Sequence, residues 1–258
     1  FVIISGGPGT GKTTTVTRIL ALLLQLPDID PARIQLAAPT GKAAMRLQES
    51  IRDAQQALNL PDSLKQQLQI PSQTLHRLLG YHASSRQFSY HRDRPLPVDV
   101  LVIDEASMMD IALMTHVLDA LPPQARLILL GDKDQLAAVE TGSVFRDLCQ
   151  GASNQFSPQV AVALQPFGVM LPHQNGRAGL NDHIVVLEQS YRFHAQSGIG
   201  QLARAIRDAN PSEMQKVLTG QYAELEWMTS DTLPSESLIA GWLAYFEEVN
   251  KPTVDIAQ

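Results

Sequence analysis

The chain has 258 residues, of which 44% are hydrophobic and 18% charged; this is the composition of an ordinary globular protein and excludes a disordered or fibrous one. Its longest apolar run, residues 19–24, is far shorter than the roughly 20 residues of a membrane-spanning helix, and its single cysteine excludes a disulfide framework and fits a reducing compartment. The net charge of −6 argues against nucleic-acid binding unless positive charge is concentrated in one segment.

Short apolar runs alternate with helical patterns up to residue 187. Continuous apolar runs are typical of strands buried on both faces of a parallel sheet, and they occupy residues 1–5, 34–38, 100–103, 127–130 and 184–187. Apolar residues at helical spacing predict helices over 13–26, 44–58 and 113–121, the last with Ser107 and Asp110 as a capping box at its start. The alternation predicts a three-layer α/β fold.

The pattern changes after residue 150. Residues 151–182 are rich in small and polar residues and predict a long, irregular and partly mobile loop. The strand at 184–187 follows, with helical patterns at 199–209, 212–218 and 238–249. We therefore expect a first domain over 1–182 and the beginning of a second domain over 183–258.

Residues 6–13 read Gly-Gly-Pro-Gly-Thr-Gly-Lys-Thr and fill every fixed position of a phosphate-binding loop between a strand and a helix. Glycines allow successive backbone N–H groups to surround an anion, and the helix N-terminus adds partial positive charge. Lys12 can neutralise the terminal phosphates, and the Thr13 hydroxyl can hold Mg²⁺. The motif predicts a nucleoside triphosphate as ligand but does not indicate what its hydrolysis drives.

Two further predicted strands end in polar residues suited to the same site. Asp104 can bind Mg²⁺ and Glu105 can orient and deprotonate a water molecule, although a surface pair of acids after a strand is the alternative. Gln135 follows the next strand and can touch the γ-phosphate. A plain polar loop, or a metal pair formed by Asp132 and Asp134, are the alternatives there.

Three other motifs are less specific when taken alone. Residues 38–44 place Thr40 at a helix N-terminus, where it can hold a phosphodiester or simply cap the helix. Residues 72–80 combine hydroxyls, a histidine and an arginine with an apolar helix face, as the start of a surface helix also does. After the last predicted strand, Arg192 can act as an arginine finger across a domain cleft, and Tyr191 can stack on a base.

Positive charge is concentrated between residues 72 and 97, where four arginines stand against one aspartate. A basic segment on an acidic protein is the electrostatic footprint of a nucleic-acid surface. The segment therefore removes the objection that the net charge raises against nucleic-acid binding.

Taken in order, the motifs resemble motifs I, Ia, Ib, II, III and IV of superfamily 1 helicases. They read Gly-Gly-Pro-Gly-Thr-Gly-Lys-Thr, Ala-Pro-Thr-Gly-Lys-Ala-Ala, Thr-Leu-His-Arg-Leu-Leu-Gly, Asp-Glu-Ala-Ser, Gly-Asp-Lys-Asp-Gln-Leu and Gln-Ser-Tyr-Arg-Phe. Over residues 1–210 they are most similar to the RecD family, the α subunits of the RecBCD exonuclease V complex. The resemblance implies a RecA-like P-loop fold for the first domain and the start of a second RecA-like domain.

The resemblance also implies an activity: an ATP-dependent 5′-3′ DNA helicase or translocase of double-strand-break repair and recombination. Its implied cofactors are ATP and Mg²⁺. Its implied partners are single-stranded DNA, duplex DNA ends and the RecB and RecC subunits, in the bacterial cytoplasm at the nucleoid.

Site residues are implied position by position. The nucleotide-binding residues are Gly6, Gly7, Pro8, Gly9, Thr10, Gly11, Lys12, Thr13, Thr14 and Tyr191, with the tyrosine on the adenine. The catalytic residues are Lys12, Glu105, Gln135 and Arg192, the last a finger from the second domain. Thr13 and Asp104 hold Mg²⁺. The DNA-binding residues are Pro39, Thr40, Thr74 and His76.

The family carries an insertion between motifs Ib and II that in some members is a hairpin splitting the duplex. Here the corresponding residues are 81–97, which carry Arg86, Arg92 and Arg94 and alternate partly in hydrophobicity. We interpret them as a small pin with a basic flank, with a solvated loop as the alternative.

The chain also departs from the family pattern, since motifs V and VI and the upstream segment that holds the adenine have no counterpart in it. We therefore expect these 258 residues to be part of a longer protein, to bind nucleotide weakly and to show little or no helicase activity by themselves. Two rivals remain: a stand-alone RecD-like helicase, and a non-motor P-loop protein such as a switch or kinase. Nothing in the sequence supports a nuclease.

Overall fold

The computed structural model describes residues 1–135, 144–173, 179–193, 196–220, 222–225, 227 and 242–243. They belong to two compact units, Phe1–Gln196 and Ser197–Gln258. The helix predicted over 238–249 lies outside the described residues except for two helical positions, 242 and 243. No helix within the described ranges has both the length and the hydropathy needed to cross a bilayer.

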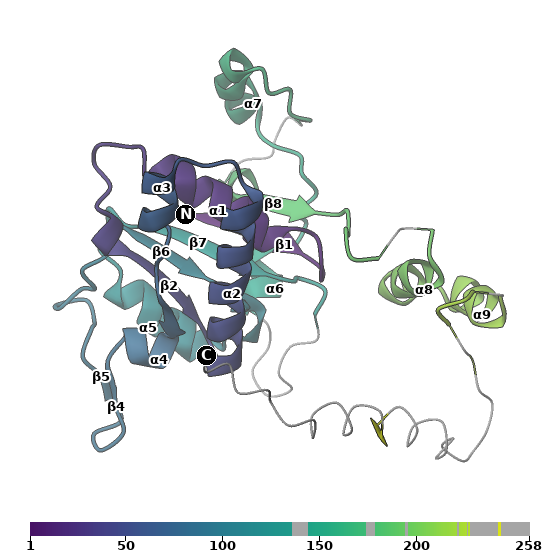
Figure 1. Ribbon diagram of the computed structural model, residues 1–258, viewed down its shortest axis with the longest axis horizontal. Coiled ribbons are helices and arrows are strands. Elements are labelled where there is room, and N and C mark those ends of the chain that lie inside the picture. The colour runs from purple at the N-terminus through teal and green to yellow at the C-terminus, as the bar shows by residue number, and fades with distance from the viewer. Residues whose placement is uncertain are drawn as a thin grey trace, which may run out of the picture. The chain divides into compact units, whose positions relative to one another are not determined.

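A six-stranded sheet forms the centre of the first unit, with the strand order β3-β2-β6-β7-β1-β8 (Figure 1). All neighbouring strands in it run parallel. Its strands are β1 Val2–Gly6, β2 Ile34–Ala38, β3 Ser72–Thr74, β6 Val100–Ile103, β7 Arg126–Gly131 and β8 Ile184–Leu187. All five predicted strands are confirmed to within one residue at each end, whereas β3 was not predicted.

Helices cover both faces of this sheet, as the three-layer prediction requires (Figure 1). One face carries α1 Lys12–Leu23, α2 Gly41–Ala57 and α3 Asp62–Gln67. The other face carries α4 Leu75–Leu78, α5 Ile111–Ala120 and α6 Val144–Leu148. Successive residues of a strand point to opposite faces, so Val102 packs into the core beneath α1 and α2 while Ile103 packs into the core beneath α4, α5 and α6. The fold is the RecA-like P-loop α/β fold that was expected.

The helix caps correct one detail of the sequence analysis. Asp110 alone begins α5, because its carboxylate accepts a hydrogen bond from the backbone N–H of Leu113 at 2.7 Å. Ser107 does not form the predicted capping box. It lies in the preceding short helix η2, Ala106–Met108, with its side chain directed elsewhere.

Part of the segment predicted as an irregular loop is helical. Within 151–182 the structure contains α7 Pro158–Leu164, η3 Gln165–Phe167 and the first residues of η4 Gly179–His183. The Ser157 hydroxyl caps α7 and a proline follows at its first position, a sequence signal for a helix start that the overall composition of the segment concealed. Two further short elements are η1 Pro31–Arg33 and the hairpin of β4 Tyr81–His82 and β5 Gln87–Phe88.

The predicted domain boundary after residue 182 is too early. β8 pairs with β1, with Ile184 opposite Ile3, so it completes the first sheet rather than opening a new one. The first unit accordingly extends to Gln196. Pairing between segments this distant in sequence leaves no local signal, whereas the change in composition at 151 was conspicuous.

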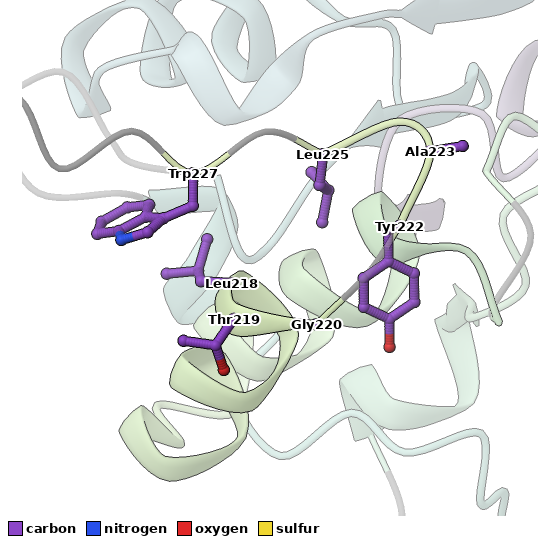
Figure 2. A pocket seen from close by; sticks show the side chains of 7 residues that line it. All are labelled: Leu218, Thr219, Gly220, Tyr222, Ala223, Leu225 and Trp227. Carbon is purple, nitrogen blue, oxygen red and sulfur yellow. The ribbon is translucent and has the colours of Figure 1, made fainter.

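The second unit begins with α8 Gly198–Arg207 and α9 Pro211–Thr219, which pack against each other. The end of α9 and the residues after it line an open pocket of about 680 Å³ with an uncharged lining (Figure 2). The lining residues are Leu218, Thr219, Gly220, Tyr222, Ala223, Leu225 and Trp227. The RecA-like identity of this second unit stays a prediction.

Candidate active site

The connection between β1 and α1 turns tightly. Gly9 and Gly11 adopt left-handed conformations, with φ of 74° and 84°, which glycine reaches without steric strain. α1 begins at Lys12 with Gly11, which has no side chain, as its N-cap. The first N–H groups of the helix are therefore directed toward the loop, where they can bind an anion.

All nine residues of the predicted phosphate loop lie between the last residue of β1 and the first turn of α1. They are Gly6, Gly7, Pro8, Gly9, Thr10, Gly11, Lys12, Thr13 and Thr14. The Lys12 ammonium group donates hydrogen bonds to the backbone carbonyls of Gly6 and, at 3.1 Å, of Gly7. It therefore lies over the loop, where it can neutralise a phosphate.

Asp104 and Glu105 follow β6, two strands away from β1 in the sheet. The Asp104 carboxylate accepts a hydrogen bond from the Glu105 backbone N–H at 2.8 Å. Burial raises the pKa of Asp104 and the charge of Glu105 adds to this effect, while that hydrogen bond and the charge of Lys12 lower the pKa. The interaction with Lys12 brings the acids of β6 and the phosphate loop into one electrostatic site.

We expect Asp104→Asn to raise the melting temperature by about 2–4 °C, because it removes a partly desolvated charge that is kept for function. The folded-state pKa of Asp104 is raised above 3.8, so the wild-type protein gains stability as the pH falls through the window between that raised pKa and 3.8. The difference in melting temperature between Asp104→Asn and the wild type should therefore become smaller as the pH falls through this window. Thermal melts at several pH values measure both effects, and a variant less stable than wild type at neutral pH would contradict the expectation.

Thr13 and Asp104 are the predicted Mg²⁺ residues. Thr13 lies in the first turn of α1 and Asp104 at the end of β6, and both are half-buried. A hydroxyl and a carboxylate are the hard oxygen ligands that Mg²⁺ prefers, and it commonly takes only one or two protein ligands beside water and phosphate. A carboxylate with a pKa raised by burial is one that a divalent cation would stabilise in its charged form. The two side chains therefore fit a Mg²⁺ ion.

Gln135 follows β7 and is fixed by a side chain that was not predicted to belong to the site. The Ser107 hydroxyl, which is buried, donates a hydrogen bond to Gln135 Oε1 at 2.7 Å. Arg146 of α6 donates to the backbone carbonyl of Gln135 at 3.1 Å. With its oxygen occupied by Ser107, the Gln135 side chain presents its NH₂ group as a donor, which suits a phosphate oxygen. The Asp-Glu-Ala-Ser motif contained the signal for Ser107.

We expect Ser107→Ala to lower kcat for ATP hydrolysis about tenfold with little change in KM, because it frees the Gln135 amide to rotate. The side chains of Ser107 and Gln135 then act as one unit. Ser107→Ala combined with Gln135→Ala should be no slower than Gln135→Ala alone. Steady-state ATPase assays of the three variants test this, and multiplicative losses would contradict it.

The neighbouring acids of this loop do not behave as a preformed metal pair. Asp132 Oδ1 accepts a hydrogen bond from the Asp134 backbone N–H at 3.0 Å, which forms a local turn. The Asp134 carboxylate pairs with Lys133 at 3.3 Å. Ser5 Oγ accepts from the Lys133 backbone N–H at 3.1 Å, so the loop is also held to β1.

Arg192 and Tyr191 lie on the phosphate loop within the first unit, which corrects the prediction that Arg192 comes from the second domain. The Tyr191 backbone N–H donates to the Gly9 carbonyl at 2.8 Å, and Ser190 Oγ donates to the Pro8 carbonyl at 3.1 Å. The side chains of Tyr191 and Arg192 are exposed. Both are therefore beside the loop and free to reach a bound nucleotide.

The predicted DNA-binding residues follow β2 and β3, at the far side of β6 and β7 from the phosphate loop. The hydroxyls of Thr40 and Thr74 accept hydrogen bonds from Ala43 N at 3.2 Å and Arg77 N at 3.3 Å, so both residues cap helices. A capping hydroxyl keeps its own O–H to donate. Pro39 is half-buried beside Thr40, and His76 is exposed on α4.

The insertion between motifs Ib and II contains the antiparallel hairpin β4–β5. Aromatic rings join it to the helices below: His76 lies 5.4 Å from Tyr81, and His116 of α5 lies 4.6 Å from Phe88, between ring centroids. Arg92 pairs with Asp119 of α5 at 2.8 Å. The hairpin is thus anchored to the unit, while its action on DNA stays a prediction.

All of these motifs meet at one edge of the sheet. β1, β2, β3, β6, β7 and β8 are parallel, and each predicted motif follows the carboxyl end of one of them. The carboxyl edge is where open α/β sheets bind ligands. Cys149 is buried near Lys133 of this edge, and burial raises the pKa of its thiol to about 11, so it is a poor nucleophile and we assign it a structural role.

The RecBCD enzyme subunit RecD of Haemophilus influenzae is 41% identical over 232 residues, which cover 88% of this chain and 36% of that protein. The ATP-dependent RecD2 DNA helicase of Deinococcus radiodurans is 40% identical over 152 residues, 59% of this chain and 18% of that protein. The crystal structure of Bacteroides Pif1 bound to ssDNA has 21% identity and a TM-score of 0.44, covering 84% of this chain and 45% of that chain. The match to the H. influenzae protein confirms the resemblance to RecD, although the chain spans little more than a third of that protein.

A family model described as an AAA domain matches residues 1–141. The matched stretch contains the phosphate loop, the acids after β6 and the loop that ends in Gln135. It also spans more than half of the chain, so this chain belongs to that AAA domain family.

Proposed function

We propose that this chain is the ATP-hydrolysing part of a 5′-3′ DNA helicase or translocase of the RecD type. The observation that carries the proposal is the shared carboxyl edge of the sheet, where the phosphate loop follows β1 and the candidate DNA residues follow β2 and β3. The acids after β6 and the Gln135 loop after β7 lie between the two groups. Such an arrangement lets one sheet hold a nucleotide and a DNA strand side by side.

Each residue of the nucleotide half has a separate task. The loop N–H groups and Lys12 bind the phosphates, and Glu105 orients and deprotonates the attacking water. Gln135 donates to the γ-phosphate, and Arg192 stabilises the charge of the transition state. Thr13 and Asp104 hold Mg²⁺, which neutralises phosphate charge when bound.

The DNA half acts mainly through phosphates. Pro39, Thr40, Thr74 and His76 surround the ends of two neighbouring strands, and the basic segment 72–97 continues from them. Binding through phosphates should weaken with salt and depend little on base sequence. We further propose that the β4–β5 hairpin is a pin that meets the DNA fork; unchanged duplex opening by the full-length protein after deletion of residues 84–94 would contradict this.

The RecD-type relatives support a proposal for the cellular role. We propose that the full-length protein acts on DNA ends in double-strand-break repair and recombination, with RecB and RecC as partners, in the bacterial cytoplasm at the nucleoid. The D. radiodurans relative is named as a DNA helicase and not as a RecBCD subunit, which supports a second candidate, a helicase that works without RecB and RecC. Co-purification of the tagged full-length protein with RecB and RecC separates the two.

The experiment that tests the proposal is ATP hydrolysis by the full-length protein with and without single-stranded DNA. We expect the DNA to stimulate hydrolysis and Lys12→Ala to abolish it. Thr115→Ala is a matched control, because Thr115 is exposed on α5 and its hydroxyl donates within its own helix. Hydrolysis that ignores DNA would instead identify a nucleotide-dependent switch or kinase.

A further inference from the structure

The segment that follows β8 is bonded to the outside of the phosphate loop. Ser190 Oγ donates to the Pro8 carbonyl at 3.1 Å, and the Tyr191 N–H donates to the Gly9 carbonyl at 2.8 Å. Both acceptors are carbonyl groups of the loop that is proposed to bind phosphates with its N–H groups. The segment belongs to the first unit, which extends to Gln196.

Glycine in the loop lets backbone N–H groups approach an anion, and it also leaves room for the segment that follows β8. A Cβ atom on Gly9 would lie 2.5 Å from Arg192 Cβ and 3.3 Å from Ser190 Oγ. A Cβ atom on Gly6 would lie 3.0 Å from the carbonyl oxygen of Leu187, the last residue of β8. The 2.5 Å separation at Gly9 leaves no room for a side chain, so the loop and the segment are closely packed at this residue.

The chemistry of the peptide group connects the two sides of the loop. In a trans peptide the C=O and the N–H point in opposite directions. The Pro8 carbonyl accepts from Ser190, and the N–H of the same peptide belongs to Gly9. A donor on the carbonyl and an anion on the N–H polarise the peptide in the same sense, so each strengthens the other.

We propose that Ser190 is a positioning residue which makes the docking of residues 188–193 depend on the nucleotide. The inference rests on the proposed function, because it needs a nucleoside di- or triphosphate on the loop. With phosphates bound, the bond from Ser190 tightens, and the neighbouring residues Tyr191 and Arg192 are held beside the nucleotide. When the phosphates leave, this bond weakens and residues 188–193 loosen on the loop.

Hydrogen exchange at the Tyr191 amide tests the proposal in the full-length protein, with Mg²⁺ and ADP as the probe. We expect ADP to slow exchange at Tyr191 in the wild-type protein. Ser190→Ala should speed exchange in the ADP complex about fivefold, the effect of one lost hydrogen bond. Ser190→Thr keeps the hydroxyl and should restore the wild-type rate. Thr115→Ala, which removes an exposed hydroxyl from α5, should leave the rate unchanged.

Calorimetric titration with ADP on the same samples distinguishes a failure of the proposed coupling from a failure of the proposed nucleotide site. If ADP binds but leaves exchange at Tyr191 unchanged, the coupling is wrong while the proposed nucleotide site stands. Equal effects of ADP on exchange in the wild type and in Ser190→Ala would show that Ser190 has no part in it. If ADP does not bind at all, the proposed function and this inference both fail. The wild-type comparison with and without ADP needs no variant, so a variant that fails to fold cannot obscure the result.

Discussion

Replacement of Arg192 by alanine is expected to lower kcat for DNA-stimulated ATP hydrolysis by about 10³-fold, the smaller end of the range for an arginine finger. The structure holds the backbone of this residue against Gly9, and its side chain is exposed beside the loop. An arginine finger stabilises the charge distribution of the transition state more than that of the bound nucleotide, so the loss should fall on kcat, while nucleotide binding weakens less than about tenfold.

Steady-state hydrolysis and calorimetric ADP binding measure these two effects separately. Arg192→Lys should recover only part of the rate, because an ammonium group lacks the planar fork of a guanidinium group. Arg18→Ala is a matched control, since Arg18 is exposed on α1 and outside the predicted site. A rate for Arg192→Ala equal to that of Arg18→Ala would exclude Arg192 from the transition state.

The position of Arg192 also shows what local sequence can and cannot predict. The Ser-Tyr-Arg motif was recognisable, and its place after the strand at 184–187 was predicted correctly. The unit to which the motif belongs was predicted wrongly. The reason is that β8 joins the sheet beside β1, which lies at the other end of the first unit in sequence. Apolar runs identify buried strands, but they do not say which neighbours those strands take.

The edge strand β3 and Ser107 were missed for different physical reasons. β3 is only Ser72–Thr74, pairs with β2 alone and has half-buried side chains, so it needs no apolar run to form. Ser107 was interpreted from its spacing to Asp110, which is a local pattern. Its hydroxyl instead bonds Gln135, a residue of another strand end, and no local pattern reports such a contact.

Replacement of Glu105 by glutamine is expected to lower kcat by about 10³-fold and to leave nucleotide binding nearly unchanged, because the amide has the shape of the carboxylate but cannot accept the proton of water. Glu105 has a φ of 52°, a left-handed conformation that is uncommon outside glycine, and its carbonyl accepts from the Met108 N–H at 3.0 Å. The turn therefore fixes Glu105 next to Asp104 and does not leave it as a mobile surface acid. Single-turnover hydrolysis, which removes product release from the rate, measures the loss.

The comparison that decides the role of Glu105 is with two other carboxylates. Glu49→Gln changes an exposed acid of α2 and should hydrolyse ATP at the wild-type rate. Asp104→Asn should also stop hydrolysis, but in this variant nucleotide binding should depend less on Mg²⁺. In Glu105→Gln, nucleotide binding should depend on Mg²⁺ as it does in the wild type. If Glu105→Gln lost both ATP hydrolysis and the Mg²⁺ dependence of nucleotide binding, Glu105 would be a metal ligand rather than the base. If it hydrolysed ATP normally, the water would have to be activated by another group at the carboxyl edge of the sheet.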